Sequence, residues 1–68
     1  MPYPTNAKLP ASVRNHLPEH AQSIYREAFN HAFDAHRKEA DCEVRSHRIA
    51  WAAVKRSYIK VDGDWVAR

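Results

Sequence analysis

The feature that most restricts the fold is an apolar repeat between residues 21 and 33. Starting from Ala21, apolar residues recur at the spacing i, i+3, i+4, i+7, i+8, i+11 and i+12, which is that of one face of an amphipathic α-helix. Glu19 suits the first turn of such a helix, and Arg37 and Lys38 suit the last, because these charges oppose the helix dipole. The pattern predicts a helix over about residues 18–38 with one buried side.

A second long helix is predicted from about Glu43 to Ser57 or Ile59. On a helical wheel, one side carries His47, Ala50, Trp51, Val54 and Tyr58. The polar connector KEADCE, residues 38–43, is short, and helices joined by so short a link pack as an antiparallel hairpin.

The chain ends are predicted to be less regular. Residues 1–9 read as an extended arm, and a short helix over about residues 10–16 is anchored by Val13 and Leu17. Asp62-Gly63 is a hairpin turn signal, although Gly63 is equally a helix-end signal. We expect a short extended segment around Trp65, paired with the arm at Tyr3. The predicted fold is mainly α: a small three-helix fold built on an antiparallel helical hairpin, with a minor short β element from the termini.

Length and composition limit the protein class. The 68 residues suit a single domain, 1–68, whose small core does not favour a deep catalytic cleft. Net charge is +3, and Cys42, the only cysteine, excludes an internal disulfide. No apolar run is long enough to span a bilayer, and the start lacks the apolar stretch of a signal peptide. We therefore expect a cytoplasmic protein without direct membrane insertion.

The five histidines do not form a metal-binding pattern. His16 and His20 have the i, i+4 spacing of helical ligands, but Pro18 interrupts the helix between them. His20 and His31 are three turns apart and are expected to be solvated. His36 points to the side of Phe29 and is expected to pack beside the core with one nitrogen hydrogen-bonded. We predict no metal and no cofactor.

The aromatic side chains are predicted to form the core rather than a stacking platform for nucleic acid. The helical positions lie on the inward faces of the two long helices: Tyr25, Phe29, Phe33, Trp51 and Tyr58. Burial of each contributes roughly 1.5–3 kcal/mol, which a small domain needs. Tyr3 and Trp65 lie outside these helices and are expected to cover the open end of the hairpin.

A basic face is the clearest polar feature. Residues 44–61 contain no Asp or Glu and five basic residues, the candidate partner-binding set: Arg45, Arg48, Lys55, Arg56 and Lys60. Exposed helices usually mix charge signs at i, i+4. This face is therefore a solvated surface, a phosphate-binding surface or a contact for a protein partner. No nucleophile–histidine–acid motif and no glycine-rich phosphate loop occurs, so an enzyme is not expected.

Several stretches together resemble the ChaB family of small bacterial proteins. They are the Leu-Pro steps at 9–10 and 17–18, the segment HAQSIYREAFNHAF, and HRIAWAAVKRSYIK with its Trp51 and Tyr58. The resemblance implies a compact fold of about three helices with a small strand element and no catalytic residues. It implies a regulator of cation transport associated with a sodium or calcium/proton antiporter. DNA binding, attributed to virus-borne members, is the alternative that it implies.

Overall fold

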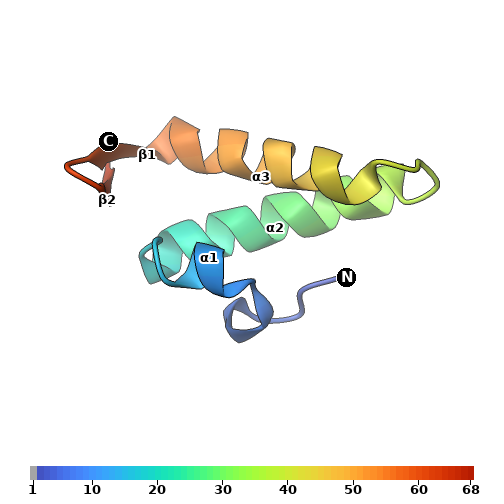
Figure 1. The fold of residues 1–68 in the computed structure, drawn as a ribbon, viewed down its shortest axis with the longest axis horizontal. Helices are drawn as coiled ribbons and strands as arrows, with labels where there is room; N and C mark the ends of the chain where they lie inside the picture. Colours follow the sequence, from blue (N-terminus) through green and yellow to red (C-terminus); the bar gives the residue numbers. More distant parts are fainter. Residues whose placement is uncertain (1) are drawn as a thin grey trace.

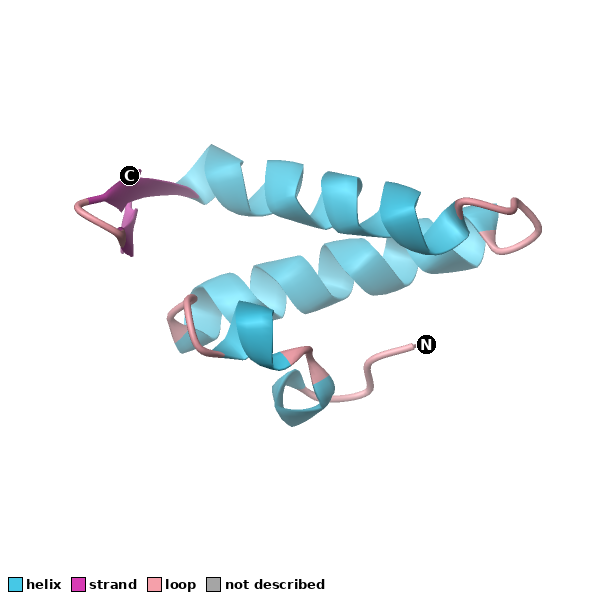
Figure 2. Cartoon of the chain, viewed as in Figure 1, coloured by secondary structure: helices cyan, strands magenta, loops and turns pink. Residues whose placement is uncertain are grey.

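A computed structural model describes residues 2–68, which form two long antiparallel helices with shorter elements at both ends (Figure 1). In chain order the elements are the 3-10 turn η1 (Asn6–Lys8), α1 (Ala11–Arg14), α2 (Glu19–His36), α3 (Cys42–Ser57), β1 (Tyr58–Val61) and β2 (Asp64–Ala67). Helices dominate and the strands are confined to the C-terminal end (Figure 2). The predicted fold class is confirmed.

The two long helices begin and end close to the predicted residues. Pro18 precedes α2 as its N-cap, and α2 ends at His36, two residues before the predicted end, because residues 37–41 turn the chain back. The backbone N–H of Glu39 donates to the carbonyl of His36 at 2.9 Å within this turn. Cys42 is buried as the first residue of α3, although the sequence placed it in a polar connector.

The core lies between α2 and α3. Large side chains come from α2, where Tyr25 and Phe29 are buried, whereas α3 contributes small ones, including Ser46 and Ala50. Small residues on one helix allow its axis to approach the other closely. The buried Ser46 hydroxyl donates to the carbonyl of Cys42 at 2.7 Å, so no hydrogen bond is lost in this contact.

The N-terminal segment packs on α2 through predicted anchors. Val13 and Leu17 are buried as expected, together with Leu9. The observed α1 is shorter than the predicted 10–16 helix, and the chain turns from residue 15 to Pro18. Gln22 holds this turn, because its side-chain amide donates to the carbonyl of Leu17 at 2.8 Å.

The N-terminal arm is held by one buried asparagine of α2. Asn30 is only 6% exposed, and its side-chain amide accepts from the Tyr3 backbone N–H at 3.0 Å and donates to the Tyr3 carbonyl at 2.8 Å. The Tyr3 ring packs against Phe29, with centroids 4.8 Å apart. Burial is the main reason that the pKa of Tyr3 is raised, and the charge of Glu43 adds to the shift.

The C-terminal residues form their own hairpin, so the expected pairing between Trp65 and the Tyr3 arm is wrong. Strands β1 and β2 are antiparallel, and Lys60 lies opposite Trp65. Asp62 and Gly63 have φ values of 51° and 87°, as a two-residue turn with two left-handed positions requires. The local turn closes this hairpin at lower entropic cost than a pairing across the whole chain would.

Within the part of the chain that the structure describes, no helix combines the length and apolar character needed to cross a bilayer.

Candidate partner-binding face

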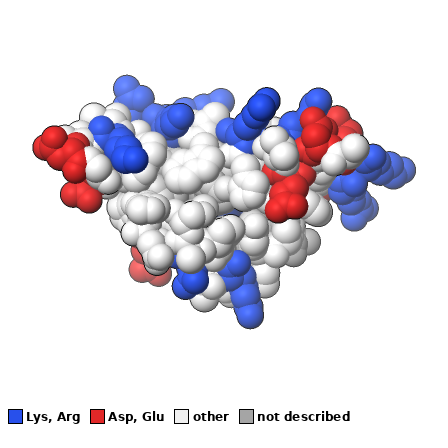
Figure 3. All heavy atoms as spheres, viewed as in Figure 1, with Lys and Arg blue, Asp and Glu red and all other residues white. Residues whose placement is uncertain are grey.

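The basic residues predicted from the sequence lie on the outer side of α3 and on β1. Arg45, Arg48, Lys55 and Arg56 are exposed on α3, and Lys60 is exposed on β1. In Figure 3, lysine and arginine side chains line the edge of the molecule along which α3 runs. The prediction that the α3 residues face away from the core is confirmed.

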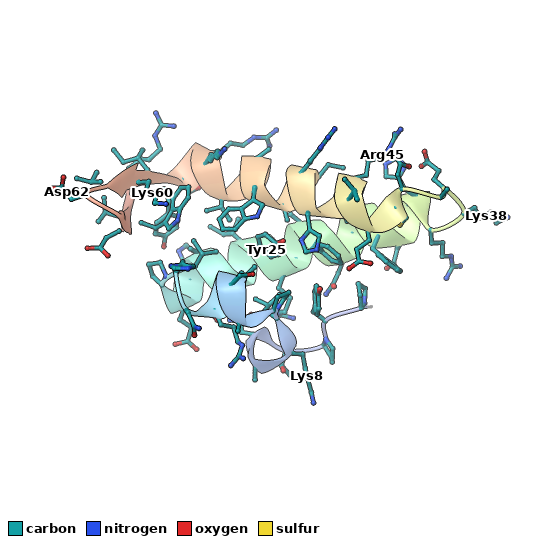
Figure 4. The ribbon with its side chains drawn as sticks, viewed as in Figure 1. Lys8, Tyr25, Lys38, Arg45, Lys60 and Asp62 are labelled. Atoms are coloured by element: carbon teal, nitrogen blue, oxygen red, sulfur yellow. The ribbon has the colours of Figure 1, made fainter. Side chains whose placement is uncertain are left out.

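Arg45 differs from the other four because connector acids surround it. Its guanidinium lies 3.4 Å from a carboxylate oxygen of Glu39 and 3.4 Å from one of Asp41. Across residues 2–68, Arg48, Lys55, Arg56 and Lys60 make no ion pair. The charge available to a partner therefore runs from Arg48 along α3 and onto the hairpin. The labels in Figure 4 show Arg45 at the other end of α3 from Lys60.

Apolar side chains interrupt the basic residues on the same side of α3. Val44 is 56% exposed and Ile49 is 40% exposed, and Ala52, one turn after Ile49, is exposed as well. A soluble helix gains nothing from exposing branched apolar side chains, although single exposed ones are common. The outer face of α3 is thus mixed, with cations and apolar side chains alternating.

Two hollows lie side by side along one flank of α3, and Trp51 and Lys55 line both. The first, of about 470 Å³, is lined by Val44, His47, Arg48, Trp51, Ala52 and Lys55. The second, of about 390 Å³, is lined by Ser12, His16, Trp51, Lys55, Lys60 and Trp65. The two hollows are therefore neighbours, with Trp51 and Lys55 at their common boundary, and we refer to the pair as the groove.

Trp51 is half-buried at the edge of the core, whereas the sequence predicted a core position. Its ring stacks on Trp65, with centroids 5.7 Å apart and planes at 29°, and meets Tyr25 edge-on at 5.2 Å. Phe33 is also only half-buried, while Tyr25, Phe29 and Tyr58 are buried as predicted. The groove was not predicted from the sequence, because it is the β1–β2 hairpin that brings the Trp65 ring against Trp51. The sequence signal that could have indicated the groove is the hairpin turn at Asp62-Gly63.

The histidines serve mainly as hydrogen-bond partners. His47 contacts the hydroxyl of buried Tyr25, and burial raises the pKa of Tyr25. His20 is exposed as predicted, but its Nδ1 also lies 3.1 Å from the hydroxyl of Tyr58. His36 has one ring nitrogen bonded, as expected, but to the Glu39 carboxylate at the surface, and its side chain is 33% exposed. It is therefore a surface hydrogen-bond partner of Glu39 rather than the predicted core-packing residue.

A third hollow, of about 510 Å³, lies on the other flank of α3, between α3 and α2. Glu27 and Arg56 both line it, so its rim carries both charge signs. In residues 2–68, no three histidine, cysteine or carboxylate side chains meet as a metal site requires. The surface of α3 offers charged and apolar contacts for binding.

Comparison with known proteins agrees with this architecture. The ChaB family model matches residues 9–68. The protein named "Putative cation transport regulator ChaB" of Escherichia coli K12 is 50% identical over 70 residues, covering 94% of this chain and 92% of the relative, and the Shigella flexneri protein of the same name matches equally. A solved structure, titled "NMR solution structure of the putative cation transport regulator ChaB", has a TM-score of 0.86 and 44% identity, covering 98% of this chain and 99% of that one. The chain therefore belongs to the ChaB family.

Proposed function

We propose that this protein is a non-enzymatic regulator of cation transport that acts by binding a protein partner, a membrane cation antiporter, through the outer face of α3. The role in cation transport is taken from the name of the relatives. The observation that carries the proposal is the mixed character of the face: Arg48 and Lys55 share one hollow with exposed Val44, and Arg56 shares another with exposed Ile49.

Protein interfaces combine apolar contact with a polar rim, and arginine is enriched in them. Phosphate-backbone binding relies on cations alone and leaves exposed valine and isoleucine without a role. The mixed face therefore favours a protein partner. The small size of the protein also suits an adaptor, because one helix face is a large share of its surface.

Site-specific photo-crosslinking tests the proposal. A benzoylphenylalanine replaces Ala52 on the outer face of α3 and, as the matched control, the exposed Ala35 on α2. The protein is irradiated in cells that express it with the antiporter, and the adducts are identified by mass spectrometry. The expected result is an antiporter adduct from position 52 and none from position 35. Equal adducts from both positions, or none with the antiporter, would contradict the proposal.

Duplex DNA is the second candidate, favoured by the absence of acidic residues between positions 44 and 61. If Arg48, Lys55, Arg56 and Lys60 each neutralised one phosphate, the salt slope would be about −3.6, and affinity would fall about 150-fold between 50 and 200 mM salt. Fluorescence anisotropy with labelled duplex measures this. Binding that follows this slope and is lost when Arg48 and Arg56 are both changed to glutamate, but not in Arg45→Glu, would transfer the function to DNA.

A further inference from the structure

The groove beside α3 combines an aromatic floor with one sign of charge. We call it the tryptophan groove and define it by Val44, Arg48, Trp51, Lys55, Lys60 and Trp65. Lys60 lies directly opposite Trp65 in the β1–β2 ladder, so both side chains leave the hairpin on the same face. The groove therefore runs from the first turn of α3 onto the hairpin.

Basic residues and no acidic ones line the two hollows of the groove, although the carboxylate of Glu43 lies 4.0 Å from His47, which lines the first hollow. The basic residues are Arg48, Lys55 and Lys60. Figure 3 shows an uncharged area in the middle of the drawn face, basic side chains along the α3 edge and the lower edge, and acidic groups on the left and right sides of the face. A partner of complementary charge is acidic.

The floor of the groove suits an apolar side chain better than a nucleic-acid base. Base stacking needs a free aromatic face. Trp51 already contacts the rings of Trp65 and Tyr25, and Val44 lines the same hollow. A leucine-sized group can fill such a hollow without displacing either ring, and burial of one contributes roughly 1.5–3 kcal/mol.

From this geometry we infer that the tryptophan groove binds a short acidic segment of a protein partner, with apolar side chains on the Trp51–Trp65 floor and carboxylates on Arg48, Lys55 and Lys60. The inference rests on the proposed function and deepens it, since it gives the chemistry of the partner segment. In an extended segment that alternates the two residue kinds, the apolar side chains all face the floor and the carboxylates all face away from it, where the long basic side chains of the groove have to reach up to them.

Tryptophan fluorescence gives a direct test, because the protein has two tryptophans and both lie in the groove. The full chain is titrated with a short synthetic peptide that alternates Asp and Leu. The controls are a peptide that alternates Lys and Leu, a peptide that alternates Asp and Ser, and oligothymidylate with the net charge of the first peptide. The expected result is a saturable change in emission with the Asp-Leu peptide, with an affinity about tenfold or more above that of either control peptide.

Two charge reversals locate the binding. The double variant Lys55→Glu with Lys60→Glu is expected to lower the affinity for the Asp-Leu peptide by about tenfold or more, whereas Lys38→Glu, in the connector, leaves it within about twofold. Circular dichroism establishes that each variant folds. Equal binding of the Asp-Leu and Lys-Leu peptides, no effect of the double reversal, no emission change at millimolar peptide, or tighter binding of oligothymidylate would each overturn the inference.

The crosslinking at Ala52 separates this result from the proposed function. If the Asp-Leu peptide does not bind but position 52 still crosslinks to the antiporter, the groove inference fails and the proposed function stands. If the peptide binds in the groove but no antiporter adduct forms, the groove chemistry holds and the antiporter is the wrong partner.

Discussion

Replacing Asn30 with alanine should release the N-terminal arm. The amide of Asn30 makes two hydrogen bonds to the backbone of Tyr3, 27 residues away, at 3.0 and 2.8 Å. Each hydrogen bond contributes about 0.5–1.5 kcal/mol, and the freed Tyr3 backbone can bond to water, so we expect Asn30→Ala to cost about 2 kcal/mol. In a domain of this size that loss lowers the melting temperature by roughly 8–16 °C.

The variant Asn30→Asp separates the donor from the acceptor. One oxygen of the new carboxylate can still accept from the Tyr3 N–H, but the other faces the Tyr3 carbonyl oxygen across the position of the 2.8 Å bond. Near pH 7 the ionised carboxylate should therefore lower the stability of the protein more than alanine does. The protonated carboxyl can again donate a hydrogen bond to the Tyr3 carbonyl. Thermal melts at pH 3 and pH 7 measure this: the deficit relative to wild type should shrink at the lower pH, because the pKa of the introduced carboxyl is raised by the unfavourable contact.

A truncation completes the test. In a chain that lacks residues 1–4, Asn30 has lost its partner, so Asn30→Ala should cost little beyond its effect on packing. The difference between the two backgrounds is the coupling energy of Asn30 with the arm, expected at about 1–2 kcal/mol. An equal loss in both backgrounds would refute the reasoning, because it would mean that Asn30 acts within the α2–α3 core and not through Tyr3.

Three further predictions concern the core and the hairpin. Ala50→Leu places a large side chain at a fully buried α2–α3 contact and should cost about 1–3 kcal/mol in urea unfolding; Ala52→Leu, on the exposed side, is the control and should cost nothing measurable. Burial raises the pKa of Tyr25, so its stabilising contribution is complete below its unfolded pKa of about 10 and is lost as pH rises above it. Tyr25→Phe should cost about 1 kcal/mol at pH 7 by breaking the contact with His47 and should soften the fall in melting temperature above pH 10; an unchanged alkaline profile would contradict this. Gly63→Ala should cost about 1 kcal/mol, because Gly63 has a φ of 87°, and should expose Trp65 to acrylamide quenching; unaltered quenching would show that the turn does not position Trp65.

The helical hairpin was predictable because its information is local. The apolar period around Tyr25 and Phe29 and the short connector define two amphipathic helices that can bury their apolar faces only against each other. The exposure of Arg48 and Lys55 follows from the same period. The sequence also signalled a turn at Asp62-Gly63, since few other dipeptides tolerate two left-handed residues, but a helix end at Gly63 remained the alternative.

Contacts between distant residues could not be predicted in the same way. That Asn30 holds the Tyr3 backbone and that Trp65 meets Trp51 both depend on how separate segments are placed in three dimensions. A helical wheel gives the side of α3 on which Trp51 lies, but not how much of that side α2 covers. It therefore could not show that the Trp51 ring is half-buried at the edge of the core.

The helices, their buried faces, the turn signal and the basic character of α3 thus follow from the order of residues alone, because each depends on residues a few positions apart. The tertiary structure decides which basic residues are left without an ion pair among the described residues. It also decides that β2 pairs with β1 rather than with the Tyr3 arm, and that the Trp51–Trp65 floor lies open beside the basic residues. Burial and charge pairing depend on the distance between atoms in the folded chain, and the sequence specifies that distance only within one element.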